Sequence, residues 1–224
     1  MTWAVTGRWG GESSGPFASL NLADHVGDEA TAVAANRAAV RDHAGATDIA
    51  IVRGIHGADV AWVHDSRAVP VADALFTDTD GLPLVVLGAD CMLIGLAAPG
   101  VIGVVHCGWR GLVAGVVPAA LDAVRARTTG PIVAILGPGI CVRCFPVGTE
   151  CADAVRAVLP AAVPDATHVD LRAGVMEMLQ EGGAEVRDHW RCTYESPELF
   201  SHRRDNPTGR HALVLWRGSA RMDS

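Results

Sequence analysis

Apolar residues along the chain fall into short continuous runs and longer amphipathic stretches. The short runs are rich in Val, Ile and Leu and predict strands at 49–52, 59–63, 82–87, 101–105, 132–136 and 211–216. The longer stretches predict helices at 28–43, 112–127, 149–159 and 170–180, with Asp28 as an N-cap and a kink or late start at Pro118. Because strands and helices intermix without a boundary, we expect one α/β (α+β) domain over residues 1–224.

Two neighbouring runs, at 84–96 and 101–106, are joined by an Ala-Ala-Pro-Gly turn and predict a hairpin whose register bears on chemistry. If Leu96 lies opposite Val101, the numbers of paired residues sum to 197. Cys91 and His106 then stand directly opposite each other, with Cβ atoms roughly 5 Å apart. Gly88 is the weak point of this hairpin, because a glycine inside a strand often marks a bulge or an end.

The composition excludes several classes of function. Half of the 224 residues are hydrophobic and 19% are charged, which is typical of a globular protein. The net charge of −7 argues against nucleic acid or an anionic membrane as the main partner. The chain contains no lysine, which excludes a Schiff-base lysine and a phosphate-loop lysine. With no run of ~18 apolar residues and no signal-peptide pattern at the start, we expect a cytoplasmic protein.

Six cysteines raise the question of disulfides or metal. A chain of this length in a reducing compartment does not need a disulfide framework. Cys141 and Cys144 have C-x-x-C spacing, but no second C-x-x-C pair follows to complete a structural zinc site. We therefore expect two ordinary thiols there, with a redox or metal-binding role as the weaker alternative.

Three potential metal ligands stand beside glycine at the ends of apolar runs: His56, Cys91 and His106. Two imidazoles and a thiolate leave the fourth position of a zinc ion open, which is the arrangement of catalytic zinc sites. On residue types alone, a buried cysteine with two hydrogen-bonded core histidines is an equally good interpretation.

Many short motifs, in order along nearly the whole chain, resemble those of one known family. The most specific is His-Cys-Gly-Trp-Arg-Gly at 106–111, which matches the H-x-G-W-R-G signature of the YfiH/YlmD family, also called the laccase-domain or multicopper polyphenol oxidase family. Further matching segments lie at 15–22, 25–28, 36–37, 56–57, 72–77, 89–91, 136–140, 145–148, 191–194, 200–205 and 208–210. Two positions depart from the family pattern: Gly54 replaces a usual Gln, and His202 replaces a usual Tyr.

The resemblance implies a fold, a metal and an activity. The implied fold is a mixed β-sheet flanked by helices, similar to the catalytic domain of cytotoxic necrotising factors. The implied metal is a single zinc, with copper as a possibility, on His56, Cys91 and His106. The implied activity is purine nucleoside phosphorylase acting on inosine, guanosine, adenosine and methylthioadenosine, with adenosine deaminase activity in the same pocket. Some members are linked instead to editing of cell-wall peptide precursors.

Phosphorolysis needs an anion site and a pocket for a nucleoside. Arg110 lies four residues after His106 and is a candidate for binding phosphate through its planar guanidinium. Arg203 and Arg204 form a second candidate anion site. Asn21 is a candidate for hydrogen bonding to the base or ribose, although an Asn in a turn is more often structural.

Two aspartates are further candidates for site residues. Asp73 and Asp90 flank the ligand-bearing strand in the sequence, and either one could orient a ligand imidazole or act as a general base. We expect Asp73 among the substrate-binding residues and Asp90 among the catalytic ones, although the sequence does not decide between these roles.

Three alternatives to a zinc phosphorylase remain at this stage. A laccase needs many histidine ligands, whereas the chain has nine scattered histidines and no H-x-H pair. A cysteine-dependent amide hydrolase would use Cys91 and His106 as a metal-free nucleophilic pair, and it is the main alternative. A non-enzymatic metal or redox protein would use Cys141 and Cys144. The zinc and glutamate motif of the base deaminases, H-x-E, is absent at His56.

Overall fold

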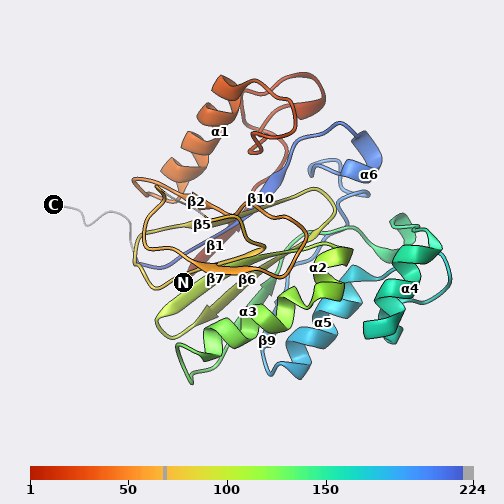
Figure 1. Ribbon diagram of the computed structural model, residues 1–224. Coiled ribbons are helices and arrows are strands. Elements are labelled where there is room, and N and C mark those ends of the chain that lie inside the picture. Colours follow the sequence, from red (N-terminus) through yellow and green to blue (C-terminus); the bar gives the residue numbers. More distant parts are fainter. Residues whose placement is uncertain (68–69, 219–224) are drawn as a thin grey trace.

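The computed structural model describes residues 1–67 and 70–218, which build four stacked layers (Figure 1). Two mixed β-sheets lie face to face, and an apolar core that includes Leu93, Val104 and Leu213 fills the space between them. One helix covers the outer face of the smaller sheet, and four helices cover the outer face of the larger one. The α/β class is therefore confirmed, with two sheets between the helices where the resemblance implies one.

The smaller sheet has the order β1-β10-β5-β2, and the larger has the order β3-β4-β7-β6-β8-β9. Only the β2–β5, β3–β4 and β8–β9 pairs are parallel. The strands of the smaller sheet are β1 (Thr2–Val5), β2 (Ala50–Ile51), β5 (Leu84–Gly88) and β10 (His211–Trp216). Those of the larger are β3 (Val60–Trp62), β4 (Ala74–Thr77), β6 (Met92–Ala98), β7 (Val101–Cys107), β8 (Val133–Leu136) and β9 (Glu185–Asp188).

The helices confirm the predicted segments with two corrections. They are α1 (Ala30–His43), α2 (Trp109–Ala114), α3 (Val116–Arg125), α4 (Thr149–Val158), α5 (Leu171–Glu181) and the short α6 (His202–Asp205). The predicted helix at 112–127 is two helices, because Gly115 has a φ of 81° and ends the first one; Pro118 lies in the first turn of the second. Asp28 is not the N-cap of α1, since Glu29 occupies that position. None of the described helices is long and apolar enough to cross a membrane.

Alternation along the strands decides which side chains point between the two sheets. In β7, Ile102 and Val104 face the smaller sheet, whereas Val101 and Val105 face the helices. His106 has the same parity as Ile102 and Val104, so it lies on the inter-sheet side at the end of β7.

The predicted register of the hairpin is wrong by two residues. Ala98 pairs with Val101 and Leu93 with His106, so paired numbers sum to 199. The turn consists of Pro99 and Gly100. The φ of Gly100 is 81°, which suits the second central position of a tight turn. A shift of two preserves the face of every side chain. Cys91 therefore keeps the face predicted for it, but its position lies diagonally to His106 and just before β6.

The predicted run through 84–96 is also divided between the two sheets. β5 ends at Gly88 in the smaller sheet, and β6 begins at Met92 in the larger one. Between them Asp90 has a φ of 95°, which turns the chain from one sheet to the other. This crossing places Cys91 at the common edge of the two sheets.

Candidate active site

His56, Cys91 and His106 come together at the edge shared by the two sheets. One donor atom from each, an imidazole nitrogen or the thiol sulfur, lies within 4.8 Å of the other two. The two imidazole rings meet edge to face, with centroids 4.7 Å apart and planes at 73°. His106 is buried, Cys91 is partly exposed and His56 is exposed, so the cluster is open on one side. The donor types and spacing fit a metal ion with one free position.

Two glycines make room for the cluster. A Cβ at Gly108 would lie 2.9 Å from His56 Nδ1 and 3.0 Å from Cys91 Sγ. A Cβ at Gly54 would lie 2.8 Å from His106 Nδ1. The departure of Gly54 from the usual family Gln therefore has a local reason, since this backbone leaves no space for a side chain there.

Asp73 holds two of the three ligand-bearing segments together. Its Oδ1 lies 3.0 Å from His106 Nδ1, and its carboxylate accepts the backbone N–H groups of Ile55, His56 and Gly57 at 3.1, 2.9 and 2.7 Å. Burial raises the pKa of Asp73, but His106 and these amides hold it below its usual value, so the carboxylate is ionised. It is fully buried and positions His106, with no surface for the substrate contact expected from the sequence.

The charges of Cys91 and His106 depend on each other. Burial raises the pKa of the Cys91 thiol, but the neighbouring imidazoles of His106 and His56 lower it overall to about 6. Burial lowers the pKa of His106, but Cys91 and Asp73 raise it overall to about 10. Cys91 is thus a thiolate at neutral pH, the form that binds a metal or attacks an electrophile.

Asp90 supports the segment that carries Cys91. Its carboxylate accepts hydrogen bonds from the Thr193 and Ser201 hydroxyls at 2.6 and 2.7 Å and from the Arg203 backbone N–H at 2.6 Å. Its backbone carbonyl accepts the Ile140 N–H at 2.8 Å. Both carboxylate oxygens are engaged by these groups, which gives Asp90 a positioning role in the structure, and the catalytic role expected for it stays a prediction.

A cavity of about 740 Å³ opens beside the cluster and is rich in arginine. Arg37, Arg53, Arg110 and Arg210 line it, together with His56, Cys91 and His106. Arg110 lies over the Trp109 ring at 4.3 Å. In the described parts of the chain, neither Arg53 nor Arg110 forms an ion pair with an acidic side chain. The cavity therefore suits an anionic ligand next to the three donor atoms.

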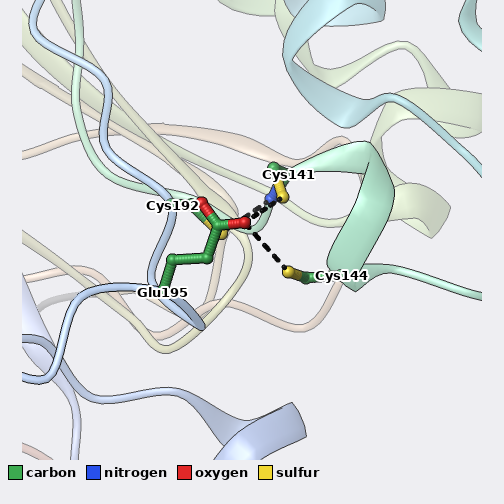
Figure 2. Close-up of side chains that lie close together, drawn as sticks. All are labelled: Cys141, Cys144, Cys192 and Glu195. Atoms are coloured by element: carbon green, nitrogen blue, oxygen red, sulfur yellow. Dashed lines mark hydrogen bonds between the residues drawn. The ribbon is translucent and has the colours of Figure 1, made fainter.

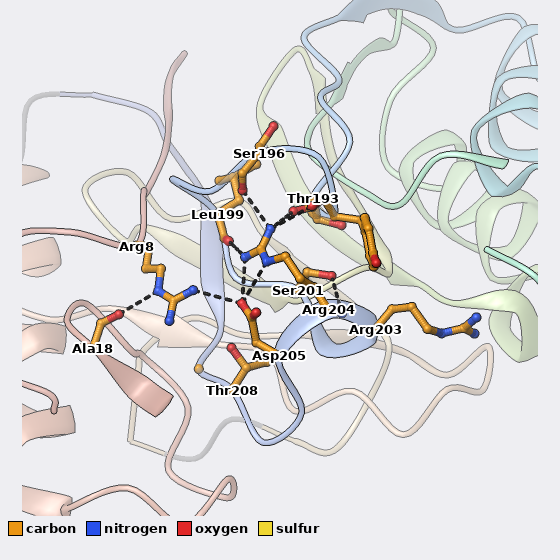
Figure 3. A network of polar contacts seen from close by, with 12 residues as sticks. Arg8, Ala18, Thr193, Ser196, Leu199, Ser201, Arg203, Arg204, Asp205 and Thr208 are labelled. Atoms are coloured by element: carbon orange, nitrogen blue, oxygen red, sulfur yellow. Dashed lines mark hydrogen bonds and ion pairs between the residues drawn. The ribbon is translucent and has the colours of Figure 1, made fainter. Parts of the chain in front are cut away.

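Three other residues expected at the site do not line this cavity. Arg204 donates to the carbonyl oxygens of Thr193 and Leu199 at 2.8 and 2.7 Å and pairs with Asp205 (Figure 3). Arg203 points away from that network and donates to a backbone carbonyl 2.6 Å away. Asn21 is buried, and its Oδ1 accepts the backbone N–H of Arg210 at 2.9 Å. In this structure these side chains bind neighbouring backbone groups, and their expected substrate contacts stay a prediction.

Sequence reasoning missed Arg37, Arg53 and Arg210 as cavity residues. Arg37 and Arg210 stand in two of the matched motifs, Asn-Arg and Thr-Gly-Arg, so a signal for both was present. Arg53 carries no comparable signal. Arg37 pairs with Asp24 at 3.3 Å, and Arg210 donates to nearby backbone carbonyls, which leaves Arg53 and Arg110 as the less engaged pair.

Comparison with solved structures identifies the fold class. The crystal structure of YlmD from Geobacillus stearothermophilus matches with a TM-score of 0.87 and 32% identity, covering 97% of this chain and 92% of that one. A Neisseria meningitidis protein of the DUF152 family matches with a TM-score of 0.87 and 33% identity, covering 96% and 94%.

Sequence comparison identifies the family. A protein-family model described as multi-copper polyphenol oxidoreductase laccase matches residues 2–218. The chain belongs to this family, which confirms the resemblance to the YfiH/YlmD family. A Streptomyces coelicolor protein named purine nucleoside phosphorylase is 43% identical over 96% of this chain and 94% of its own. A Mycobacterium tuberculosis H37Rv protein of the same name is 41% identical over 95% and 90%.

The ligand inventory differs from what the family description suggests. Within residues 1–67 and 70–218, two clusters bring together three or more His, Cys, Asp or Glu side chains. One contains two histidines and the other contains none. A multi-copper centre needs several more imidazole ligands than this edge supplies.

Proposed function

We propose that the protein is a zinc-dependent purine nucleoside phosphorylase. The observation that carries the proposal is a single cavity that joins the His56, Cys91 and His106 cluster to Arg110. Relatives that are 43% and 41% identical over nearly the full chain are named for this activity. In the proposed reaction a phosphate oxygen bonds to C1′ of the nucleoside, the C1′–N9 bond breaks, and the purine leaves with a proton at nitrogen.

Zinc is the metal we assign to the cluster. A thiolate with two imidazoles is a ligand set that zinc favours, and the open side faces the cavity. Zinc bound there supplies a Lewis acid and lowers the pKa of a bound water. The contact of 3.0 Å between Asp73 Oδ1 and His106 Nδ1 favours the tautomer with its proton on Nδ1, in which Nε2 would be the atom free to bind the metal.

The arginines supply the anion site. The guanidinium of Arg110 offers a planar pair of N–H donors to phosphate, and its stacking on Trp109 restricts its orientation. Arg53 also lines the cavity and adds positive charge to it. We expect the substrates to be inosine, guanosine, adenosine and methylthioadenosine. Adenosine deamination in the same cavity is part of the proposal: water would replace the C6 amino group, which leaves as ammonia, and a zinc held by His56, Cys91 and His106 would supply Lewis-acid chemistry for it.

Cysteine-dependent amide hydrolysis is the second candidate. The observation in its favour is the lowered pKa of Cys91 beside His106, the state of a nucleophilic thiolate–imidazolium pair. In this case Cys91 would attack an amide carbon and His106 would protonate the leaving amine.

Purified protein tests the two candidates directly. Incubation with inosine and phosphate should release hypoxanthine and ribose 1-phosphate in equal amounts, and omission of phosphate should abolish the release. Elemental analysis of the same sample should find zinc. Release of amine from peptide-like amides by protein stripped of metal, with no phosphorolysis under any condition, would instead select the hydrolase.

A further inference from the structure

A second cluster of potential ligands lies away from the cavity, and it contains Cys141, Cys144, Cys192 and Glu195 (Figure 2). One donor atom from each lies within 4.8 Å of all the others. Glu195 Oε1 is 3.8 Å from Cys141 Sγ and 3.6 Å from Cys144 Sγ. Four donors around a tetrahedral zinc with bonds near 2.3 Å are separated by about 3.8 Å, so the spacing is already that of a metal site.

Two turns bring these four side chains together, one closed by a hydrogen bond over three residues and the other by one over four. The Cys144 N–H bonds to the Cys141 carbonyl at 3.1 Å, and the Ser196 N–H bonds to the Cys192 carbonyl at 3.1 Å. The first turn presents a C-x-x-C pair and the second a C-x-x-E pair. The sequence shows no second C-x-x-C pair because the second half of the cluster lies 48 residues further along and ends in Glu rather than Cys.

Hydrogen bonding and charge around the cluster suit a bound cation. The backbone N–H of Cys141 points at Cys192 Sγ at 3.3 Å, a contact that stabilises a thiolate ligand. Cys141 and Cys192 are buried, whereas Glu195 closes the cluster on the solvent side. Arg143 lies 3.0 Å from Glu195 Oε1 and reduces the negative charge that three thiolates and a carboxylate bring together.

We propose that Cys141, Cys144, Cys192 and Glu195 bind a structural zinc ion. Three sulfur donors favour zinc over magnesium or calcium, which take oxygen ligands. All four positions are filled by the protein, so this site lacks the open position that a substrate needs. It is thus distinct in kind from the cluster of His56, Cys91 and His106.

A zinc ion at this position would also stabilise one wall of the active-site cavity. It would join the loop after β8 to the segment before α6, two regions that meet otherwise through a bridge between Gly139 and Cys192. The neighbours of two ligands, Ile140 and Thr193, both hydrogen-bond to Asp90. Asp90 in turn precedes Cys91. The ion therefore stabilises the support on which Cys91 is held.

Metal content of reduced, purified protein tests the proposal. Cys144 is partly exposed, so Cys144→Ser is expected to fold and to hold about one zinc fewer per chain than the unmodified protein. Cys151→Ala, which removes a cysteine of α4 outside both clusters, should keep the full content. His56→Ala should keep the zinc of the second cluster, so failure of the active-site assignment and failure of this proposal are distinguishable.

The Glu195 position provides a test that does not depend on removing a cysteine. Glu195→Gln should speed zinc transfer to a chelator, and Glu195→Cys, which completes a site of four thiolates, should slow it. Cobalt substituted at this site should give the strong visible bands of a tetrahedral, sulfur-rich centre that Cys144→Ser weakens. Equal metal content in the unmodified protein and Cys144→Ser, together with unchanged transfer rates in both Glu195 variants, would overturn the proposal. A disulfide among the three cysteines in freshly reduced, zinc-supplied protein would also overturn it.

Discussion

Asp73 Oδ1 lies 3.0 Å from Nδ1 of His106, a pair brought together from positions 33 residues apart. The same carboxylate accepts three consecutive backbone N–H groups from the turn that carries His56. One buried aspartate therefore sets the orientation of one candidate ligand and the backbone of another. Any metal affinity of the cluster depends on this residue.

Replacing Asp73 should separate metal affinity from folding. Asp73→Asn keeps the shape but removes the charge and presents an amide to the donors around it. We expect zinc affinity to fall by roughly 10–100-fold, the usual cost of losing an outer partner of a ligating histidine. Competition with a chelator measures the affinity, and Asp122→Asn on the surface of α3 is the control. Equal affinities in the two variants would contradict the positioning role.

Gly108 offers a steric test of the cluster. In Gly108→Ala the new methyl group overlaps His56 Nδ1 and Cys91 Sγ, whereas the backbone φ of −86° is compatible with alanine. We expect loss of about one zinc per chain, with the zinc of the second cluster kept and little change in the melting temperature. Gly148→Ala is the matched control, because its Cβ has no neighbour within 4 Å. Full metal content in Gly108→Ala would show that the three side chains do not act together.

Arg110 tests the phosphate site. Arg110→Lys keeps the charge but loses the planar pair of donors. The KM for phosphate should rise about tenfold, equivalent to ~1.4 kcal/mol, with a smaller change in the KM for inosine. Arg204→Lys should lower the melting temperature instead, since Arg204 holds backbone carbonyls. A phosphate KM that stays constant in Arg110→Lys would place the anion elsewhere, with Arg53 as the next residue to test.

His56 separates the two candidate activities. In a zinc phosphorylase, His56→Ala should lower metal content and inosine cleavage together. In a cysteine hydrolase, the Cys91–His106 pair remains, and Cys91 should still be alkylated by an amide-like electrophile at a near-normal rate. Full phosphorolysis by His56→Ala protein that has lost the zinc of the active-site cluster would rule out the zinc mechanism.

Because His211 is buried, we predict that the free energy of unfolding falls as the pH is lowered. The His211 side chain is fully buried, and neither ring nitrogen has a hydrogen-bond partner among the described residues. Burial, with a contribution from Arg210, lowers its pKa to about 3. The pKa of histidine in the unfolded chain is about 6.5. Between about pH 6.5 and pH 3, His211 is therefore protonated in the unfolded chain and neutral in the folded one. The free energy of unfolding should fall by about 1.4 kcal/mol per pH unit from pH 6.5 downward, and this contribution is absent above that pH.

Denaturant unfolding at several pH values measures this effect. His211→Leu should remove the part of the slope that one proton contributes, so its stability relative to the unmodified protein should rise as the pH falls. His43→Gln on the surface of α1 serves as the control. Parallel pH curves for the unmodified protein and His211→Leu would show that His211 is protonated in the fold.

Local patterns predicted most elements because their information lies within a few residues. β10 has the bounds predicted for it, and α4 ends one residue earlier than predicted. The period of apolar positions in such segments is set by strand or helix geometry alone. β9 was missed because its Glu185–Asp188 sequence is polar, and it is a strand only because β8 pairs with it at the sheet edge.

The candidate ligands His56, Cys91 and His106 were also accessible from the sequence, through glycine-flanked motifs shared with a known family. The contacts that hold these ligands in place were not accessible from the sequence. Neither the Asp73 bond to His106 nor the meeting of Cys141 with Cys192 has a local signal, since the partners lie 33 and 51 residues apart. The sequence alone determines which chemical groups the side chains carry. The tertiary structure determines which of them become hydrogen-bond partners or share a ligand set, because this depends on which loops the packed sheets bring to one edge.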